Sequence, residues 1–245
     1  MSQTRKRLDI ILAERGLAES RQRAQALILA GLVSVNGAPA QKAGERYADD
    51  AEIAVKGKDH PYVSRGGVKL AHAMDIFHIN PGGYVCVDVG ASTGGFTDCL
   101  LQRGAVKVYA IDVGENQLDY RLRSDPRVIS MEKVNARNMD MTPIVEPLDM
   151  LVADVSFISL KLVIPPFLAL LRPGAHLILL VKPQFEAGRD KVNKGIVRDE
   201  SVHEEVLKEI TGFFENLGLK TTGTAESPIL GRKGNKEFLL GLSKS

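Results

Sequence analysis

The sequence contains no tryptophan, only two cysteines and few aromatic residues, which make up 5% of its 245 positions. Cys86 and Cys99 are too few for a disulfide framework and lack the spacing of metal ligands. Cys86 stands in the apolar run YVCVDV, which favours a buried free thiol. The five histidines are scattered, with no pair one helical turn apart, so we expect no metal site.

Long hydrophobic runs are also missing, since none approaches the ~20 residues that a membrane helix needs. The opening stretch, MSQTRKRLDIILAERG, has neither the apolar segment nor the small-residue cleavage site of a signal peptide. Hydrophobic residues make up 44% and charged residues 25%, a composition typical of a folded globular protein. We therefore expect a cytoplasmic protein that makes no membrane contact.

The net charge of +2 is unevenly distributed. Residues 1–60 carry ten Lys or Arg against eight Asp or Glu, whereas residues 61–245 carry twenty-two of each. A basic excess at one end is typical of a terminal nucleic-acid-binding module, although a solvated helix face would give the same pattern. The candidate phosphate contacts are Arg5, Arg7, Arg21 and Arg23.

The first sixty residues predict a small α+β module. Apolar residues at helical spacing favour a helix over Arg7–Glu14 that ends at Gly16, and Ser20 is a suitable N-cap for a second helix that stops at Gly31. The run LVSVNGAPA predicts a strand that enters an Asn-Gly hairpin turn, and AEIAV predicts another strand near 51–55. The polar, proline-terminated segment 57–61 is the expected linker.

Beyond the linker, apolar strand-length runs alternate with helical patterns. The strand-like runs lie at 85–90, 108–113, 149–156 and 176–182, and the helical segments at 95–103, 158–171 and 201–217, the middle one interrupted by two prolines. This alternation predicts a parallel sheet covered on both faces. Two further strand-like runs, LKTTGTAES and NKEFLLGLS, predict a terminal hairpin.

A glycine-rich loop, Gly90–Phe96, follows the first strand of this sheet, where doubly wound folds bind ligands. Asp112 ends the next strand, where an acidic side chain can hold the hydroxyls of an adenosine ribose. The spacing G-x-x-x-G-G, with acidic Asp88 just before it, favours the cationic S-adenosylmethionine over a pyrophosphate-containing dinucleotide. The alternative is a turn that serves only helix–strand packing.

Four charged residues lie at expected strand or helix ends: Lys69, Asp154, Lys182 and Glu237. Taken singly, each is typical of a solvated surface charge. Together with the strings YVSRGGVKL, DVGASTGGFTDCLL, ADVSFISL, LVKPQFEAGR and SPILGRKGNKEFL, they make the chain resemble the FtsJ-like ribose 2′-O-methyltransferases. The signature of those enzymes is a Lys-Asp-Lys-Glu tetrad in this order. The closer resemblance is to the haemolysin A/TlyA family of ribosomal RNA methyltransferases, with an amino-terminal RNA-binding domain of the ribosomal protein S-four type.

The resemblance implies a role for each residue of the tetrad. A ribose hydroxyl is almost never ionised at neutral pH, so attack on a sulfonium methyl group needs a base or a stabilised alkoxide. Lys182 is the implied base and Lys69 the neighbouring cation that, with desolvation, makes a neutral amine accessible. Asp154 and Glu237 are implied to orient the lysines and the hydroxyl. The implied cofactor residues are Asp88, Gly90, Ser92, Gly94, Gly95, Phe96, Asp112 and Asn135.

The sequence as a whole predicts two domains: an RNA-binding module at 1–58 and a seven-stranded Rossmann-like methyltransferase at 61–245. The implied activity is S-adenosylmethionine-dependent methylation of a ribose 2′-hydroxyl, of cytidine, in ribosomal RNA or ribosomal subunits. Lys191 and Lys194 are further candidate RNA contacts, or solvated loop residues.

Two other functions compete with this interpretation. A non-enzymatic RNA-binding or ribosome-assembly factor could use the same fold, but all four tetrad positions and the cofactor loop are intact. A cytolysin, as the haemolysin name suggests, requires an exported chain or a membrane-inserting amphipathic segment, and the sequence shows neither.

Overall fold

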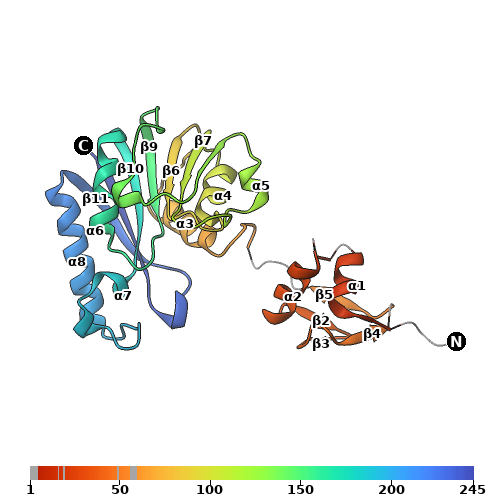
Figure 1. Cartoon of the computed structure of the whole chain (residues 1–245). Coiled ribbons are helices and arrows are strands. Elements are labelled where there is room, and N and C mark those ends of the chain that lie inside the picture. Colours follow the sequence, from red (N-terminus) through yellow and green to blue (C-terminus); the bar gives the residue numbers. More distant parts are fainter. Residues whose placement is uncertain (1–4, 16, 19, 49, 56–59) are drawn as a thin grey trace. The chain divides into compact units, whose positions relative to one another are not determined.

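The computed structural model describes residues 5–15, 17–18, 20–48, 50–55 and 60–245. Contacts between Cα atoms divide the chain into two compact units, Met1–Pro61 and Tyr62–Ser245, here called the small and the large unit (Figure 1). Gly16 and most of the expected linker lie outside the described residues.

The small unit packs two helices against short antiparallel strands. Its elements are β1 (Arg5–Arg7), α1 (Leu8–Glu14), α2 (Arg21–Leu29), β2 (Val33–Val35), β3 (Ala38–Pro39), β4 (Arg46–Ala48) and β5 (Ile53–Val55). Strands β3, β2 and β5 form one sheet, and β1 pairs with β4. Leu8, Leu12, Ile28 and Val33 anchor the shared core.

The small unit contains the helix cap and the hairpin turn that the sequence predicts. The Ser20 hydroxyl accepts a hydrogen bond from the backbone N–H of Arg23 at 3.1 Å, so Ser20 caps α2. Asn36 and Gly37 both have positive φ, 49° and 78°, as the turn of a tight hairpin requires. The N-cap and the hairpin are thereby confirmed.

The large unit contains a seven-stranded sheet in the order β11-β12-β10-β9-β6-β7-β8. The strands are β6 (Val85–Val89), β7 (Lys107–Ile111), β8 (Val128–Met131), β9 (Leu148–Ala153), β10 (Leu171–Val181), β11 (Leu219–Glu226) and β12 (Phe238–Lys244). Strands β10, β9, β6, β7 and β8 run parallel, and β12 is antiparallel to both of its neighbours. The predicted parallel sheet with a terminal hairpin is confirmed.

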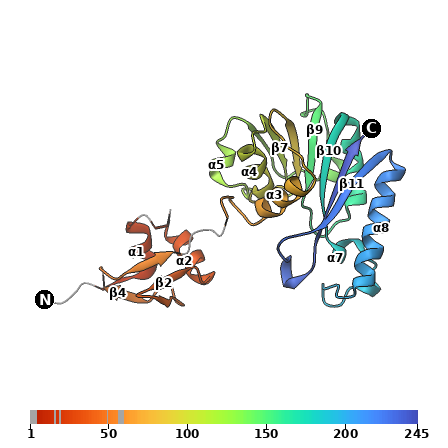
Figure 2. The same ribbon diagram turned by 180° about the vertical axis from the view of Figure 1, so that it is seen from behind.

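Helices cover both faces of this sheet (Figures 1 and 2). The helices are α3 (Gly66–Ile76), α4 (Gly95–Gln102), α5 (Tyr120–Arg123), α6 (Leu160–Val163), α7 (Pro183–Glu186) and α8 (Glu200–Asn216). Alternate residues of β6 face opposite layers, because Cys86 packs with α3 and α4 whereas Val87 and Val89 pack with α6 and α8. Cys86 is fully buried, as predicted, and burial raises the pKa of its thiol.

The helical segment expected at 158–171 is interrupted at its two prolines, as predicted. Helix α6 ends at Val163, and a 3₁₀ helix, Pro165–Leu170, follows, because the two prolines remove backbone donors from a longer α-helix. Strand β10 starts earlier than expected, directly after that 3₁₀ helix. Within the described residues, no helix combines the length and the apolar character that crossing a bilayer requires.

Candidate active site and cofactor pocket

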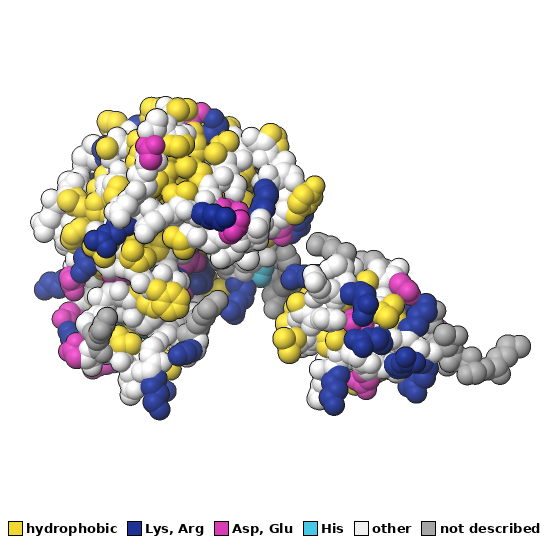
Figure 3. Space-filling model, viewed as in Figure 1, with side chains coloured by type: hydrophobic (Ala, Val, Ile, Leu, Met, Phe, Trp, Pro, Cys, Tyr) yellow, Lys and Arg dark blue, Asp and Glu magenta, His cyan; other side chains and the backbone are white. Residues whose placement is uncertain are grey.

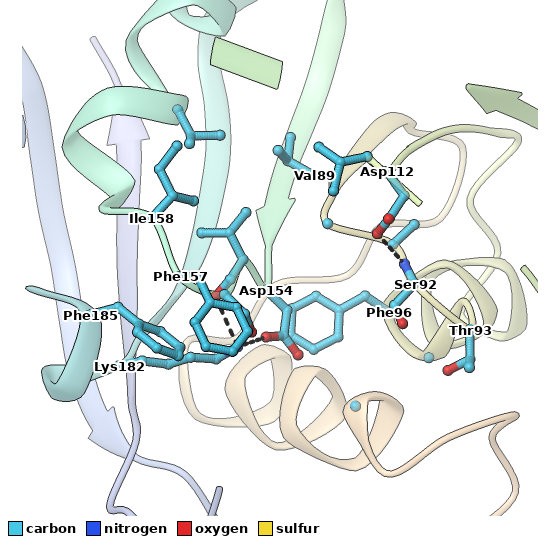
Figure 4. A pocket seen from close by; sticks show the side chains of 18 of the residues that line it. Val89, Ser92, Thr93, Phe96, Asp112, Asp154, Phe157, Ile158, Lys182 and Phe185 are labelled. Carbon is cyan, nitrogen blue, oxygen red and sulfur yellow. Dashed lines mark hydrogen bonds and ion pairs between the residues drawn. The ribbon is translucent and has the colours of Figure 1, made fainter. Parts of the chain in front are cut away.

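A cavity of about 590 Å³ lies beyond the carboxyl ends of β6, β7, β9 and β10 (Figure 4). The strand order reverses between β6 and β9, and α/β sheets bind their ligands at such a switch point. The volume is within the ~300–1,000 Å³ typical of small-molecule sites. Ten of the expected site residues line it: Lys69, Gly90, Ser92, Gly95, Phe96, Asp112, Asn135, Asp154, Lys182 and Glu237.

The loop after β6 has room only for glycine at two of its positions. Gly90 has φ +87°, and a Cβ there would lie 2.6 Å from the carbonyl oxygen of Asp154. Gly94, at φ +93°, would place a Cβ 2.3 Å from Leu122. Gly94 is not among the residues that line the cavity, and its missing side chain leaves room for Leu122 at the start of α4. Its contact with the cofactor stays a prediction.

Asp112, directly after β7, is hydrogen-bonded to the glycine-rich loop (Figure 4). Its Oδ2 accepts a hydrogen bond from the Ser92 N–H at 2.8 Å, and its Oδ1 accepts one from the Gly114 N–H at 2.7 Å. Each carboxylate oxygen can accept a second hydrogen bond, so both remain able to receive a hydroxyl group. The backbone therefore orients Asp112 before any ligand arrives. Asn135 lines the cavity from the segment after β8.

Asp88 lies behind the cavity wall and does not line it, in contrast to the expected cofactor contact. Its Oδ2 accepts hydrogen bonds from the N–H and the hydroxyl of Thr97, at 2.9 and 2.7 Å, and so holds the first turn of α4. Its Oδ1 is buried and has no hydrogen-bond partner among the described residues. Burial raises the pKa of Asp88 to about 7.

Two lysine–carboxylate pairs face the cavity. Lys69, on α3, and Glu237, just before β12, are 168 positions apart in the chain, yet Nζ and Oε2 are 2.5 Å apart. Lys69 is 9% exposed and Glu237 3%. The backbone of Gly231 covers the carboxylate, since a Cβ at that position would lie 2.0 Å from Glu237 Oε1.

The second pair joins the ends of β9 and β10. Lys182 Nζ is 2.5 Å from Asp154 Oδ1, and it also lies 2.9 Å from the Val155 carbonyl oxygen and 3.0 Å from the Ser156 hydroxyl. These three acceptors match the three N–H bonds of an ammonium group. The structure thus brings all four tetrad residues to one cavity, with each lysine in contact with one carboxylate.

Sequence reasoning missed two aromatic residues, Phe157 and Phe185, that also line the cavity. Their ring centroids are 4.9 Å apart at a tilt of 49°, and Figure 4 shows both rings beside Lys182. Phe157 is 84% exposed and has φ +64°, an uncommon conformation for a bulky residue. A useful signal was present, because each phenylalanine stands three residues after a tetrad member.

Glu186 fixes the loop that carries Phe157. Its two oxygens accept hydrogen bonds from the Ser159 hydroxyl at 2.5 Å and the Leu160 N–H at 2.8 Å. Glu186 therefore joins α7 to the amino end of α6. Burial raises the pKa of its carboxyl group.

The basic residues of the small unit fall into two groups. Arg7 donates two hydrogen bonds of 3.0 Å to the buried Asp9, and Arg21 reaches the same carboxylate at 3.4 Å. The Arg7 guanidinium holds the pKa of Asp9 well below its usual range. Arg5 and Arg23 are exposed and form no ion pair with any carboxylate of the described residues. Figure 3 shows Lys and Arg side chains gathered on the visible face of this unit.

The sheet order, the glycine-rich loop and the lysine–carboxylate pairs define a Rossmann-like methyltransferase fold. Residues 62–244 match the profile of the FtsJ-like methyltransferases, and residues 6–53 match that of the S4 domain. The chain belongs to the FtsJ-like methyltransferases, within the TlyA/haemolysin A family that joins them to an S4 domain.

Similar proteins cover nearly the whole chain. YqxC of Bacillus subtilis, provisionally named an rRNA methyltransferase, is 47% identical over 99% of this chain and 87% of its own length. The 16S/23S rRNA (cytidine-2′-O)-methyltransferase TlyA of Mycobacterium tuberculosis is 42% identical over 97% of this chain and 90% of its own. A solved structure from Streptococcus thermophilus, provisionally called a hemolysin, is 44% identical and has a TM-score of 0.78, covering 100% of this chain and 90% of its own.

Proposed function

We propose that this chain transfers a methyl group from S-adenosylmethionine to the 2′-hydroxyl of a cytidine ribose in ribosomal RNA. The observation that carries the proposal is that two lysine–carboxylate pairs face the cavity that also contains the glycine-rich loop and Asp112. The family match and the relatives named as rRNA methyltransferases support it.

The residues on one side of the cavity fit this cofactor. The glycine-rich loop allows close backbone approach, and Asp112 is already oriented to accept the two ribose hydroxyls. The unpartnered, buried Oδ1 of Asp88 adds a polar group behind the loop. S-adenosylmethionine, when bound, supplies a methyl group on a positively charged sulfur.

The tetrad addresses the weak acidity of the ribose hydroxyl. In this proposal Lys182 Nζ would first lose a proton to solvent and, as a neutral amine, would accept the proton of the 2′-hydroxyl while that oxygen takes the methyl group and the bond from the methyl group to sulfur breaks. Asp154 holds Nζ in place and balances its charge, while Lys69 and Glu237 form a second, nearly neutral pair at the same cavity. Burial in a low-dielectric site strengthens each of these contacts.

The aromatic pair provides a place for the target base. Phe157 presents an exposed ring beside Lys182, and a base splayed out of its RNA helix can stack on such a ring. Stacking is worth ~1–3 kcal/mol per base. In this role Phe157 positions the nucleotide so that its ribose reaches Lys182.

The small unit is proposed to recruit the RNA. Residues 1–58 would form the RNA-binding domain and 61–245 the catalytic domain, with Arg5 and Arg23 as free phosphate contacts. We also propose a cytoplasmic location, with ribosomal RNA or ribosomal subunits as partners. Removing residues 1–58 should leave a folded domain that binds cofactor but methylates RNA poorly at limiting RNA.

The proposal is tested by mapping 2′-O-methyl groups in ribosomal RNA from cells with and without this protein. A site, at cytidine, should lose its modification when the protein is absent and regain it on complementation. Identical maps from both cell types would overturn the proposed substrate.

A further inference from the structure

Two tight turns with the same central dipeptide lie side by side in the large unit. Lys194 and Gly195 form one, with φ of 51° and 80°, and Lys233 and Gly234 form the other, with φ of 58° and 79°. The first is closed by reciprocal backbone hydrogen bonds between Asn193 and Ile196, of 3.0 and 2.9 Å. The second is closed by the hydrogen bonds Gly231 N–H to Asn235 O, 2.9 Å, and Gly234 N–H to Gly231 O, 3.2 Å.

Asn235 fastens the two turns together. It is only 3% exposed, and its side chain accepts a hydrogen bond from the Val197 N–H at 3.1 Å and donates one to the Gly195 carbonyl at 2.9 Å. The Lys233 ammonium adds a hydrogen bond of 3.0 Å to the Lys194 carbonyl oxygen. The relative position of the two lysine-bearing turns is therefore fixed by the fold.

The turns adjoin the catalytic cavity. Ile229, Leu230 and Gly231 line it on the approach to the second turn, and Glu237 lines it two residues after Asn235. The second turn is therefore continuous with a segment of the cavity wall.

The charges on these turns are not neutralised. Lys194, Arg198 and Lys233 are exposed, and none of them forms an ion pair with a carboxylate within the part of the chain that the structure describes. Nearby lysines behave differently, because Lys191 binds both oxygens of Glu205 at 2.6 Å and Lys236 lies 3.3 Å from Glu200. Figure 3 shows Lys and Arg side chains along the lower edge of the large unit.

We propose that the twin-turn surface, defined by Lys194 and Lys233 on the two turns fastened by Asn235 and by Arg198 just after the first turn, binds backbone phosphates of the RNA next to the target nucleotide. The inference rests on the proposed function and adds a second RNA-binding surface, on the catalytic domain itself. Exposed cations that pair with no carboxylate of the described residues, carried close to the cavity, complement a phosphodiester backbone, and phosphate contacts set register without reading sequence. Lys191, although adjacent in sequence, is committed to Glu205 and is not part of this surface.

The test measures binding of the full chain to a fluorescent single-stranded RNA over a range of salt concentrations. In the double variant Lys194→Gln/Lys233→Gln, the log–log salt slope should become shallower by ~0.7–0.9 for each phosphate that the surface no longer neutralises. Glutamine, like lysine, is an unbranched side chain, so the substitution adds no strain at the two positive-φ positions. Lys220→Gln is the matched control, because Lys220 is an exposed lysine at the far end of β11, the strand that leads into the second turn.

Methyl transfer to ribosomal subunits gives the second readout. The double variant should raise KM for RNA and leave kcat and the cofactor Kd unchanged, and Lys220→Gln should match wild type in all three. A double variant with the wild-type salt slope and KM would overturn the surface while leaving the proposed function intact. Absence of methyl transfer by the wild-type chain would overturn the proposed function, and the RNA-binding slopes would then still decide whether the surface exists.

Discussion

The cavity of the large unit and the surface of the small unit hold their cations in opposite ways. In the large unit Lys69 and Lys182 are buried, and each contacts a carboxylate at 2.5 Å. In the small unit Arg5 and Arg23 are exposed, and even the tied Arg7 keeps much of its side chain in solvent. A buried charge needs a paired partner because desolvation is costly, whereas an exposed one does not.

This difference determines which task each set of cations can perform. Buried pairs fix atoms to within a fraction of an ångström, as the placement of a proton acceptor requires. Exposed arginine side chains can move, and they can bind an RNA phosphate at a small cost in free energy. Substitutions in the two units should therefore separate these two uses of positive charge.

The largest effect is expected for Lys182. Lys182→Ala should reduce methyl transfer by at least ~10²–10⁴-fold, the usual contribution of a general base, with cofactor and RNA affinity nearly unchanged. Lys182→Arg should fail almost as badly, because a guanidinium keeps the charge but cannot accept a proton. Single-turnover kinetics on ribosomal subunits measure both. An active arginine variant would make Lys182 an electrostatic stabiliser of the alkoxide instead.

The second-largest effect is expected on the pH dependence of the free energy of unfolding, and it comes from Asp88. Its folded-state pKa of about 7 lies above the unfolded value, so the folded protein holds a proton that the unfolded chain releases. The contribution of Asp88 to the free energy of unfolding is therefore full at low pH and falls as pH rises from about 4 to about 7, by up to ~1.4 kcal/mol per unit.

Asp88→Asn removes this pH dependence and retains an oxygen that can accept from Thr97. Urea unfolding should show the variant gaining stability relative to wild type between pH 5 and pH 8. A constant difference between the two proteins over that range would show that Asp88 is ionised in the fold.

A smaller effect is expected on the affinity for the cofactor. Asp112→Ala removes a charged hydrogen-bond acceptor worth ~1.5–3 kcal/mol, so S-adenosylmethionine affinity should fall ~10–100-fold. Calorimetry on the folded variant measures this, and Asp112→Asn, which keeps one acceptor oxygen, should lose less. Wild-type affinity in both variants would remove Asp112 from the cofactor site.

The smallest effects belong to the small unit. Arg23→Gln should flatten the salt dependence of RNA binding by somewhat less than one log–log unit and leave thermal stability unchanged, because Arg23 is exposed. Arg7→Gln should also lower the melting temperature, because it leaves the buried Asp9 with fewer donors. Equal melting temperatures for the two variants would contradict the division into free and tied arginines.

The two units also differ in how far sequence patterns predict their charged contacts. The strands, the glycine-rich loop and the ends at which Asp112, Asp154 and Lys182 stand follow from local patterns, because parallel strands bring their carboxyl ends to one edge. The contact between Lys69 and Glu237 could be expected only from the resemblance, since 168 positions separate them.

The local patterns did not predict which charged side chains are buried or which residues they bind. Asp88 and Gly94 belong to the motif but are not among the residues that line the cavity, because Asp88 is fully buried against Thr97 of α4 and Gly94 packs against Leu122. The attachment of Arg21 to Asp9 depends on how α1 and α2 pack, which no local spacing encodes. Phe157 has no periodic signature, and its spacing from Asp154 was the one local signal that pointed to the cavity.

The most direct measurement supplies the purified full chain with S-adenosylmethionine labelled in its methyl group and unmodified ribosomal subunits, then identifies the labelled nucleoside by mass spectrometry. The account predicts 2′-O-methylcytidine, formed by wild type and absent with Lys182→Ala. Label on a base, or equal labelling by both proteins, would contradict it.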